Sequence, residues 1–556
     1  MSYQAQKYTK LGYLGGGTQK YTKLRYLGDG TFSDVYKVLG DDRREYAMKV
    51  VDFKYHAQYI IIELRALSYL RHPNIIKLED HTVGEKFEFI LELMARDINK
   101  KKFPGACMKK LILQLVNGLD YMHARGVIHG DIKPRNILYK YVGGEMTLVY
   151  TDFNSCVVKP SSHECRSEHY TLWWRSPEVM LRMGFGQEAD VWALGCVIYE
   201  MYRGHPLAHE DGEINQIKKV FKILGNPLPV WPEIVNSTSW KILKDDASSL
   251  PEEGIFHATS GPSYMALLRE MLKINPKHRI SASNLLRHSF LQDVKMFDNS
   301  QDISQDVKTT DNPVSQDVKM SDNSQEDSIL EDTDDLTLRY LEEREIKKCV
   351  KISITQPRRS ILFEWTCAVM KEYRMSRPVL FLAFELFDQV GFLYEDGTKN
   401  IQMTMVSCLF IADHAISEDA AEAQDLVYIS DNSFTEARLY EQIYEVLKIV
   451  GNMLHMSTAY ERLINKLPKV LDDRAVNIAS FFLFLIYMNN QRYENEDMAL
   501  ASIAMMERYY GEISPSIGNI IESTVKVALE WKYDPEDDAC QIFTGLKWEE
   551  VKKRLR

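Results

Sequence analysis

Two short stretches of the sequence contain the polar residues that phosphoryl transfer requires. The segment IHGDIKPRNIL supplies Asp131, Lys133 and Asn136, and the segment TDFN supplies Asp152. Asp131 would accept or orient the proton of an acceptor hydroxyl, and Lys133 would stabilise the transferring phosphate. Asn136 and Asp152 offer oxygen ligands to a magnesium ion that bridges the phosphates. Each pattern occurs often by chance, so the prediction depends on the residues upstream.

Three upstream features complete this set in the expected order. Gly28 and Gly30 lie between two strand-like runs, where a glycine-rich turn lets backbone amides approach a triphosphate. Taken alone, the two glycines fit a plain hairpin turn at least as well. Lys49 lies in the buried-strand pattern YAMKVV, where a charge is costly unless it is paired. Glu63, in a helical segment, would be its partner. Alone, each charge would be a surface residue, but the ordered set predicts a phosphate-transfer site.

The surrounding sequence resembles that of a known family. LRHPNIIKL, TLWWRSPEV, EADVWALGCVIYEM and VFKILGNPLPVWPEI make residues 20–291 similar to eukaryotic protein kinases, and closely to the cyclin-dependent branch. The resemblance implies a two-lobed fold with ATP in the cleft. It also implies a serine or threonine acceptor, because Lys133 follows Asp131 by two residues. The nucleotide-binding residues that it implies are Leu27, Gly28, Gly30, Val35, Ala47, Lys49 and Leu138, with Leu91 as gatekeeper and a hinge from Glu92 to Met94.

Other positions match features that stabilise this domain. They are Thr171, which supports the catalytic loop, Glu178 and Arg279, which form an ion pair of the larger lobe, and Asp190, which anchors the catalytic-loop backbone. Arg175 matches the pocket of proline-directed members, but His169 and Tyr170 replace its usual small apolar pair. The sequence therefore leaves open whether proline follows the acceptor.

The chain departs from the family at several places. Ser33 replaces the third glycine of the glycine-rich loop, Gly130 replaces the arginine before the catalytic aspartate, and Asn154 replaces the glycine of the metal-binding motif. None removes a reacting group, and Asn tolerates left-handed backbone angles. The inhibitory Thr-Tyr pair is Thr31-Phe32, so half of that phosphorylation switch is missing.

The phosphate clasp of the activation loop is absent from the sequence. The usual phosphorylated threonine aligns with Arg166, and the three arginines that hold it align with Ile62, Gly130 and Val157. A phosphate there would have no cationic partner among those positions. We therefore expect a kinase that needs no activation-loop phosphorylation, with the neighbouring Ser167 as the remaining alternative.

The C-terminal part resembles a cyclin. Residues 334–532 form a series of amphipathic helical patterns, in which Arg359 and Trp365 fall in the first helix of the cyclin box and Asp388 matches a box aspartate. A weaker repeat from about Val476 would complete a double cyclin fold. The lysine and glutamate with which a cyclin grips the kinase backbone align with His414 and Ile443. The sequence therefore does not predict the standard docking contacts.

One feature of the kinase part favours a docked partner. Ile60, Ile61 and Ile62 directly precede Glu63. Successive helix positions rotate by about 100°, so the three side chains cannot all face one core. A cyclin-like domain would cover the exposed one, and crowding under the small lobe is the alternative.

These patterns divide the chain into four parts. Residues 1–19, which partly duplicate residues 20–31 (KYTK recurs), form an expected flexible tail, and residues 20–291 form the kinase domain. Residues 292–333 repeat QDVK among polar residues and cannot bury enough apolar area to order, so they form a disordered linker. Residues 334–556 form the cyclin-like domain. The expected fold class is α+β: a bilobal protein-kinase fold, strand-rich first and helical from about Cys107, then an all-α double cyclin fold.

Composition excludes several other classes. The 556 residues carry a net charge of −11, and no basic face suggests a nucleic-acid partner. Eight cysteines form no C-x-x-C pair, so reduced thiols are expected. The N-terminus has no signal-peptide pattern, and the most apolar run, Ile478 to Met488, is too short to span a membrane. We expect an intracellular protein, cytoplasmic or nuclear, without a membrane partner.

Three functions remain. The first is an active Ser/Thr kinase that uses ATP and Mg²⁺ on protein substrates, with its cyclin-like domain as an activator in cis or swapped between two chains. The second is a pseudokinase scaffold that sequesters substrates or regulators. The third is a cyclin-like adaptor whose kinase half only binds nucleotide. A phosphate-transfer assay separates the first from the others.

Overall fold

A computed structural model gives the arrangement of the chain. It describes residues 7–9, 20–30, 32–83, 86–158, 170–248, 250, 262–292, 356–390, 401–417, 419–451, 454, 458–467, 473–488 and 495–510. The expected linker after Gln292 lies outside these residues. So do Thr31 and the activation-loop positions Arg166, Ser167 and His169.

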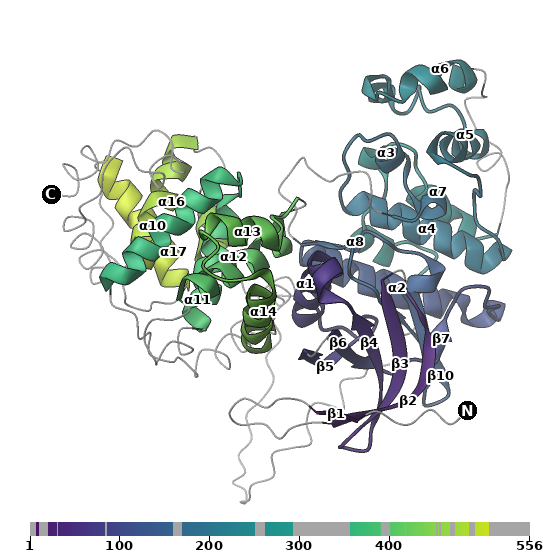
Figure 1. Ribbon diagram of the computed structural model, residues 1–556. Helices are drawn as coiled ribbons and strands as arrows, with labels where there is room; N and C mark the ends of the chain where they lie inside the picture. Colours follow the sequence, from purple (N-terminus) through teal and green to yellow (C-terminus); the bar gives the residue numbers. More distant parts are fainter. Residues whose placement is uncertain are drawn as a thin grey trace, which may run out of the picture.

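The N-terminal part is an antiparallel sheet with the strand order β1-β2-β3-β4-β6-β5 (Figure 1). Its strands are β1 (Lys7–Thr9), β2 (Lys20–Asp29), β3 (Ser33–Gly40), β4 (Glu45–Val51), β5 (Leu78–Val83) and β6 (Phe87–Glu92). In β4, Tyr46, Met48 and Val50 are buried in one apolar cluster. Because side chains alternate along a strand, Ala47 and Lys49 lie on the opposite face of the sheet.

The duplicated N-terminal sequence forms a strand pair. The two KYT copies pair with each other, since Lys7 lies opposite Thr22 and Thr9 lies opposite Lys20. The sequence analysis expected a flexible tail over residues 1–19. For residues 7–9 the structure differs, because β1 finds its hydrogen-bonding partner in the second copy of the same sequence.

A single long helix, α1 (Phe53–Tyr69), packs beside this sheet. The Asp52 side chain caps its start by accepting a hydrogen bond from the Lys54 N–H at 3.1 Å. Backbone angles at His56 are non-helical, so the first turn is offset from the rest. Figure 1 places α1 between the sheet and the C-terminal helices.

The larger lobe is mainly helical. Its helices are α2 (Gly105–Ala124), α3 (Pro177–Met180), α4 (Gln187–Arg203), α5 (Glu213–Leu224), α6 (Trp240–Ser248), α7 (Tyr264–Met271) and α8 (Ala282–Leu286). Short strands also follow Cys107, which the sequence analysis did not expect: β8 (Val127–Ile128), β9 (Ile137–Val142), β10 (Glu145–Tyr150) and β11 (Val157–Val158). β9 pairs with β10 and with β7 (Arg96–Asp97), and β8 pairs with β11. These strands frame the catalytic segments.

Two buried groups hold the larger lobe together. Arg279 donates from Nη1 and Nη2 to the two carboxylate oxygens of Glu178, at 2.6 and 3.0 Å. Both side chains are almost fully buried. Breaking such a pair would leave one uncompensated charge in the core, which is strongly destabilising.

The C-terminal part contains only helices within its described residues. They are α10 (Gln356–Glu372), α11 (Arg377–Gln389), α12 (Ile401–Ile416), α13 (Ala423–Ile429), α14 (Glu436–Val450), α15 (Ala459–Lys466), α16 (Asp473–Met488) and α17 (Asn495–Tyr510). Every residue of α12 from Met403 to Ala415 is buried, as expected of a helix that is enclosed on all sides. Buried Arg359 donates to both carboxylate oxygens of Asp388 and to the Tyr487 carbonyl, which ties α10 to α11 and α16.

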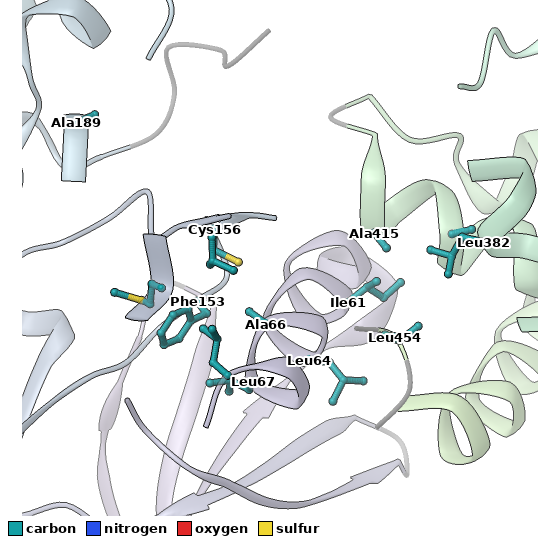
Figure 2. Close-up of a cluster of buried hydrophobic side chains, with 14 of the residues drawn as sticks. Ile61, Leu64, Ala66, Leu67, Phe153, Cys156, Ala189, Leu382, Ala415 and Leu454 are labelled. Carbon is teal, nitrogen blue, oxygen red and sulfur yellow. The ribbon is translucent and has the colours of Figure 1, made fainter. Parts of the chain in front are cut away.

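The two parts meet at α1, which packs against α12, while α14 reaches β5 (Figure 1). At the start of α1, the Phe53 ring lies 5.1 Å from that of Tyr444 and 6.3 Å from that of Tyr440. Figure 2 shows Ile61 facing Ala415 and Leu454 of the C-terminal part. Ile60 and Ile61 are buried, and Ile62 is half-buried. The C-terminal helices therefore cover the isoleucine run on the side that the kinase core does not.

Candidate active site

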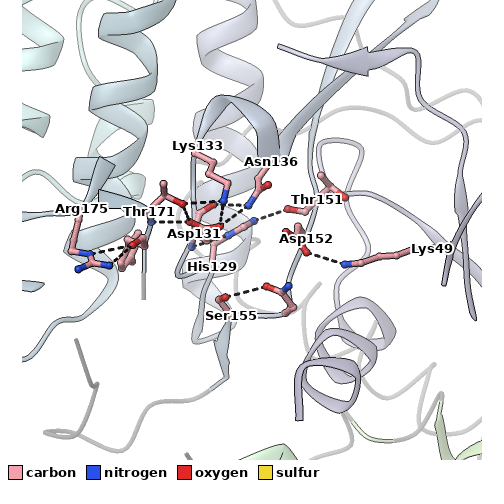
Figure 3. A network of polar contacts seen from close by, with 12 residues as sticks. Lys49, His129, Asp131, Lys133, Asn136, Thr151, Asp152, Ser155, Thr171 and Arg175 are labelled. Carbon is pink, nitrogen blue, oxygen red and sulfur yellow. Dashed lines mark hydrogen bonds and ion pairs between the residues drawn. The ribbon is translucent and has the colours of Figure 1, made fainter. Parts of the chain in front are cut away.

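Asp131 lies at the centre of a hydrogen-bonded group between the lobes (Figure 3). Its Oδ1 accepts from the Thr171 N–H at 3.0 Å and the Thr171 hydroxyl at 2.8 Å. Its Oδ2 accepts from Lys133 Nζ at 2.6 Å and Asn136 Nδ2 at 3.0 Å. Lys133 also contacts Thr171 Oγ1 at 2.9 Å. These contacts fix the carboxylate and keep a cation beside it.

The backbone that carries Asp131 is held in place by Asp190. Asp190 of α4 accepts from the N–H groups of His129 at 2.8 Å and Gly130 at 3.1 Å. The Asp131 N–H donates to His129 Nδ1, so His129 Nε2 carries the proton that it donates to the Thr151 carbonyl at 3.1 Å. His129 thereby links the Asp131 segment to the strand that leads to Asp152.

Lys49 joins the sheet, α1 and the Asp152 segment. Its Nζ lies 2.8 and 2.7 Å from the two carboxylate oxygens of Glu63. It also lies 2.8 Å from Asp152 Oδ1 (Figure 3). Glu63 is only 2% exposed, so α1 must be seated against the sheet for this contact to form. The structure brings together all six residues that the sequence analysis assigned to phosphate transfer and metal binding.

Burial and charge oppose each other at these groups. Burial lowers the pKa of Lys49, but Asp152 and Glu63 outweigh burial and raise it above its ordinary value. Burial raises the pKa of Asp152, yet the neighbouring Lys49 holds it below its ordinary value. Burial raises the pKa of Glu63, and Lys49 only partly offsets this. Lys49 is therefore cationic and Asp152 anionic at neutral pH.

The oxygen atoms near Asp152 suit a magnesium ion. Asn136 Nδ2 donates to Asp131, which leaves the Asn136 amide oxygen for another ligand, and Asp152 uses only Oδ1 for Lys49. Mg²⁺ takes one or two protein oxygens together with water and phosphate. Accordingly, the described residues contain no group of three or more acidic, His or Cys ligands that would indicate an all-protein metal site. The residues present fit Mg²⁺.

The expected adenine-binding residues come from five strands, β2, β3, β4, β6 and β9. Val35 lies opposite Lys49, and Ala47 lies opposite Leu91, across neighbouring strands of the sheet. Leu27 of β2 is 39% exposed, and Leu138 is half-buried in β9. Glu92 ends β6, and its N–H donates to the Lys77 carbonyl at 3.0 Å. The hinge therefore begins at a fixed backbone position.

Two departures from the family are mild in the structure. Gly130 has φ 77°, a left-handed conformation in which glycine is the least strained residue. Asn154 is not among the residues with positive φ, so the backbone there does not require glycine. The tolerance of Asn for left-handed angles is thus not needed.

Tyr170 anchors the end of the activation segment. Its N–H donates to the Gly130 carbonyl at 2.7 Å, and its hydroxyl donates to buried Asp190 at 2.9 Å. Arg175 donates from Nε and Nη2 to the Tyr170 carbonyl, at 3.1 and 2.8 Å. Tyr170 is only 3% exposed, so its bulk is turned into the lobe. Sequence reasoning read this tyrosine as bulk in the acceptor pocket and missed its contact with Asp190.

Sequence reasoning also missed three polar residues of α1. Gln58, Arg65 and Ser68 donate hydrogen bonds to carbonyls of the C-terminal helices. Their spacing of seven and three residues places them on one helix face, which was the available indication.

Comparison with known families and proteins agrees with this geometry. A model of the protein kinase domain matches residues 21–291, and a model of the cyclin N-terminal domain matches residues 329–454. The chain is 31% identical over 248 residues to "Cell division control protein 2 homolog 3" of Trypanosoma brucei brucei, covering 42% of this chain and 78% of that protein. It is 32% identical over 241 residues to "Mitogen-activated protein kinase mpkC" of Aspergillus niger, covering 41% of this chain and 59% of that protein.

The chain belongs to the protein kinases of the cyclin-dependent type. More particularly, it joins such a kinase domain to a cyclin-like domain in one polypeptide. The expected α+β fold class, a kinase fold followed by a helical cyclin fold, is confirmed. In the described parts of the chain, no helix is long and apolar enough to cross a membrane.

Proposed function

We propose that this chain transfers the γ-phosphoryl group of ATP to serine or threonine hydroxyls of proteins. The observation that carries the proposal is the Asp131 group, in which one carboxylate is oriented by Thr171 and Asn136 while Lys133 lies beside it. In the transfer, the acceptor oxygen bonds to the γ-phosphorus as the bond to the departing ADP oxygen breaks. Asp131 accepts the hydroxyl proton. Lys133 stabilises negative charge on the transferred group.

The remaining residues would hold the nucleotide. Lys49, oriented by Glu63, would bind phosphate oxygens, and Asn136 and Asp152 would hold Mg²⁺. When bound, Mg²⁺ would neutralise charge that develops on the phosphates. The backbone amides of Gly28 and Gly30 would cover the phosphates from β2 and the turn that follows. The adenine would lie among Leu27, Val35, Ala47, Leu91 and Leu138, with its edge against the hinge from Glu92 to Met94.

The direct test is Mg-dependent phosphate transfer by purified full-length protein. Lys49→Met and Asp152→Ala should each reduce the rate by about 10³-fold or more, because each removes a charge that acts on the phosphates. Lys277→Met is the matched control, since Lys277 is exposed and its Nζ pairs with exposed Glu233 on the surface. Unchanged rates in the first two variants, or no transfer by clean wild type, would favour the scaffold.

We also propose that the cyclin-like domain activates the kinase domain in cis. The supporting observation is that α12 packs on α1, the helix that presents Glu63 to Lys49, while two tyrosines of α14 pack on Phe53 at the start of α1. Holding α1 against the sheet would keep this ion pair formed, which is a requirement for an active kinase. A full-length chain should therefore be active without a second protein.

Independence from activation-loop phosphorylation is the third part of the proposal. The C-terminal end of the activation segment is held by hydrogen bonds of the protein itself, because Tyr170 bonds to Gly130 and Asp190 while Arg175 bonds to Tyr170. Phosphatase treatment of protein from a bacterial host should leave its rate unchanged. A large fall after dephosphorylation, or in Ser167→Ala, would contradict this part.

A further inference from the structure

Three side chains on one face of α1 donate hydrogen bonds to the cyclin-like domain. The contacts are Gln58 Nε2 to the Ser417 carbonyl at 2.9 Å, Arg65 Nη1 to the Ala415 carbonyl at 2.9 Å, and Ser68 Oγ to the Gly451 carbonyl at 3.0 Å. All three acceptors are backbone groups at helix ends: α12 ends at Ile416, and α14 ends at Val450. The kinase side chains therefore cap the carboxyl ends of two helices of the other domain.

Helix ends are suitable targets for such recognition. The last four carbonyls of a helix have no partner within the helix, and they carry the negative end of the helix dipole. Buried without a donor, each would destabilise the fold. The donors from α1 satisfy one carbonyl at Ala415 and another at Gly451 inside the interface, where water is excluded.

Arg65 is the charged member of this set. It is 6% exposed, and its Nη2 lies 3.7 Å from Glu461 in the first turn of α15. Its Nε has no hydrogen-bond partner within the described part of the chain. A buried guanidinium with so few partners depends on both, because removing either the carbonyl or the carboxylate leaves it undercompensated.

The positions at which cyclins are expected to grip a kinase do not serve this purpose here. His414 Nδ1 donates to the Phe410 carbonyl of its own helix at 2.9 Å, and its ring stacks on Phe410. Burial lowers the pKa of His414 to about 4, so the ring is neutral near pH 7. Ile443 is an apolar residue of the buried core. In the expected arrangement, cyclin side chains grip the kinase backbone. Here the side chains that donate belong to the kinase helix, and the backbone carbonyls that accept belong to the cyclin-like domain.

We propose that this face of α1 is a specificity surface for the chain's own cyclin-like domain, with Arg65 as the determining residue. The partner that it fits presents two helix carboxyl ends in this arrangement and a carboxylate at the position of Glu461. The inference rests on the docking in cis proposed above. It goes further by naming the chemistry that selects the partner: a cyclin-like domain without that acid would leave Arg65 buried with one carbonyl as its acceptor.

The experiment uses the full chain with a protease site inserted between residues 292 and 329, outside both family matches. The folded protein is cut at this site, and the association of its two halves is measured by sedimentation over a dilution series. The uncut chain serves as the reference. The wild-type halves should remain together at micromolar concentration. If they separate there, the surface does not provide recognition and the inference is overturned.

Substitutions then locate the determinant. Arg65→Met keeps the unbranched apolar stem of the side chain but removes its donors, and it should weaken association by about tenfold or more. Glu461→Gln, on the other domain, should weaken it in the same direction. Lys54→Met is the matched control, because Lys54 is exposed and lies 3.9 Å from Glu436 at the edge of the interface; it should change association by about threefold at most.

Two further measurements keep the outcome clear. The double variant Arg65→Met/Glu461→Gln should weaken association by less than the product of the two single effects, because both remove one interaction. Circular dichroism of each cut variant checks that its halves stay folded. Glu461→Gln tests the Arg65–Glu461 pair from the other domain, so that α1 is left unaltered. Equal effects of Arg65→Met and Lys54→Met, or independent effects of Arg65 and Glu461, would overturn the inference.

Failure of this inference is distinct from failure of the proposed function. If Arg65 variants associate as the wild type does while the full chain transfers phosphate, the specificity surface is wrong and the kinase assignment stands. If the halves associate through Arg65 but the chain transfers no phosphate, the surface stands and the enzyme assignment fails.

Discussion

Asp190 is a single buried carboxylate that joins three segments of the larger lobe. It accepts hydrogen bonds from the backbone of His129 and Gly130 and from the Tyr170 hydroxyl, and it contacts His123 Nε2 of α2 at 3.0 Å. Burial raises its pKa, but the hydrogen bond from His123 and the nearby imidazoles hold it below its ordinary value. It therefore stays ionised and fixes the catalytic loop and the end of the activation segment together.

Tyr170→Phe tests this role, because it removes one donor to a buried carboxylate and keeps the ring. We expect the free energy of unfolding to fall by about 1–2 kcal/mol. The turnover rate should fall several-fold, while KM for ATP should be nearly unchanged, because Tyr170 bonds to Gly130 beside the catalytic Asp131 and to Asp190 and Arg175 of the larger lobe. Tyr141→Phe is the control, since Tyr141 is 59% exposed. Chemical denaturation and initial-rate assays measure both variants. If Tyr170→Phe and Tyr141→Phe had equal effects, the role of Tyr170 would be contradicted.

At this scale the sequence predicted the reacting groups but not their supports. Lys49, Glu63 and Asp131 could be found because their chemistry demands specific residue types in order along the chain. The Tyr170 contact with Asp190 could not, since it joins residues 20 positions apart through a fold whose details no local pattern specifies. The tolerance of Asn for left-handed angles was the reason given for a mild change at Asn154, but the backbone there does not adopt such angles.

At the scale of elements, the glycine-rich loop rests on α1 through aromatic rings. Phe32 stacks on Tyr59 with ring centres 5.0 Å apart and lies 4.5 Å from the His56 ring. His56 is where α1 departs from helical geometry, so the offset first turn contributes to this stack. Phe32, at the position where the resemblance implies the tyrosine of an inhibitory pair, thus contacts α1 through its ring.

Phe32→Ala should loosen the loop over the phosphates. An aromatic pair contributes about 0.5–1.5 kcal/mol beyond its buried area, so KM for ATP should rise by about twofold to tenfold. Phe32→Tyr keeps the ring and should restore the wild-type value. Initial rates over a range of ATP concentrations measure both variants. A similar rise of KM in Phe32→Tyr would show that stacking is not the cause.

Glu385 joins α11 to α15 and α16 in the cyclin-like domain. Its carboxyl accepts from the Ala459 N–H at 2.7 Å and the Tyr487 hydroxyl at 2.5 Å. Burial raises its pKa to about 8, and nearby Glu461 adds to the rise. The carboxyl is therefore largely protonated at neutral pH in the folded protein, although it ionises near pH 4.5 when the chain unfolds.

This shift predicts a pH dependence of stability. A carboxyl whose pKa is higher in the folded state binds more protons there, so its stabilising contribution is complete below pH 4.5 and is lost as the pH rises toward 8. Glu385→Gln resembles the protonated form at every pH. The melting temperature of Glu385→Gln relative to wild type should therefore increase from pH 5.5 to pH 8. A difference that is constant over this range would contradict the raised pKa.

The sequence predicted the cover over α1 but missed several strands. The run Ile60 to Ile62 indicated that something beyond the kinase core covers α1, and Ile61 does face Ala415 and Leu454 (Figure 2). The strand pair of the two KYT copies was missed, because the first copy lacks the alternating pattern that follows the second. Strands β8 and β11 were missed because two residues are too few to show a period. Strands β9 and β10, of six residues each, were missed because burial does not alternate along them.

At the scale of the whole molecule, we expect the two domains to behave as a tethered pair. A linker of about 40 flexible residues, as the sequence predicts for residues 292–333, would reach about 35 Å, on the order of a domain diameter. Such a tether gives an effective concentration near the millimolar range. An interface of modest affinity would then remain closed in the intact chain, including one whose standard cyclin contacts at His414 and Ile443 are absent.

The measurement that tests this account most directly is the specific activity of the chain, uncut and cut between residues 292 and 329, over a dilution series. Uncut protein should keep a constant specific activity at all concentrations, which also argues against domains swapped between chains. Cut protein should match it at high concentration and lose activity on dilution, as α1 loses its cover and the Lys49–Glu63 contact is no longer held. Full activity of cut protein at dilutions where sedimentation shows the halves apart would contradict activation in cis.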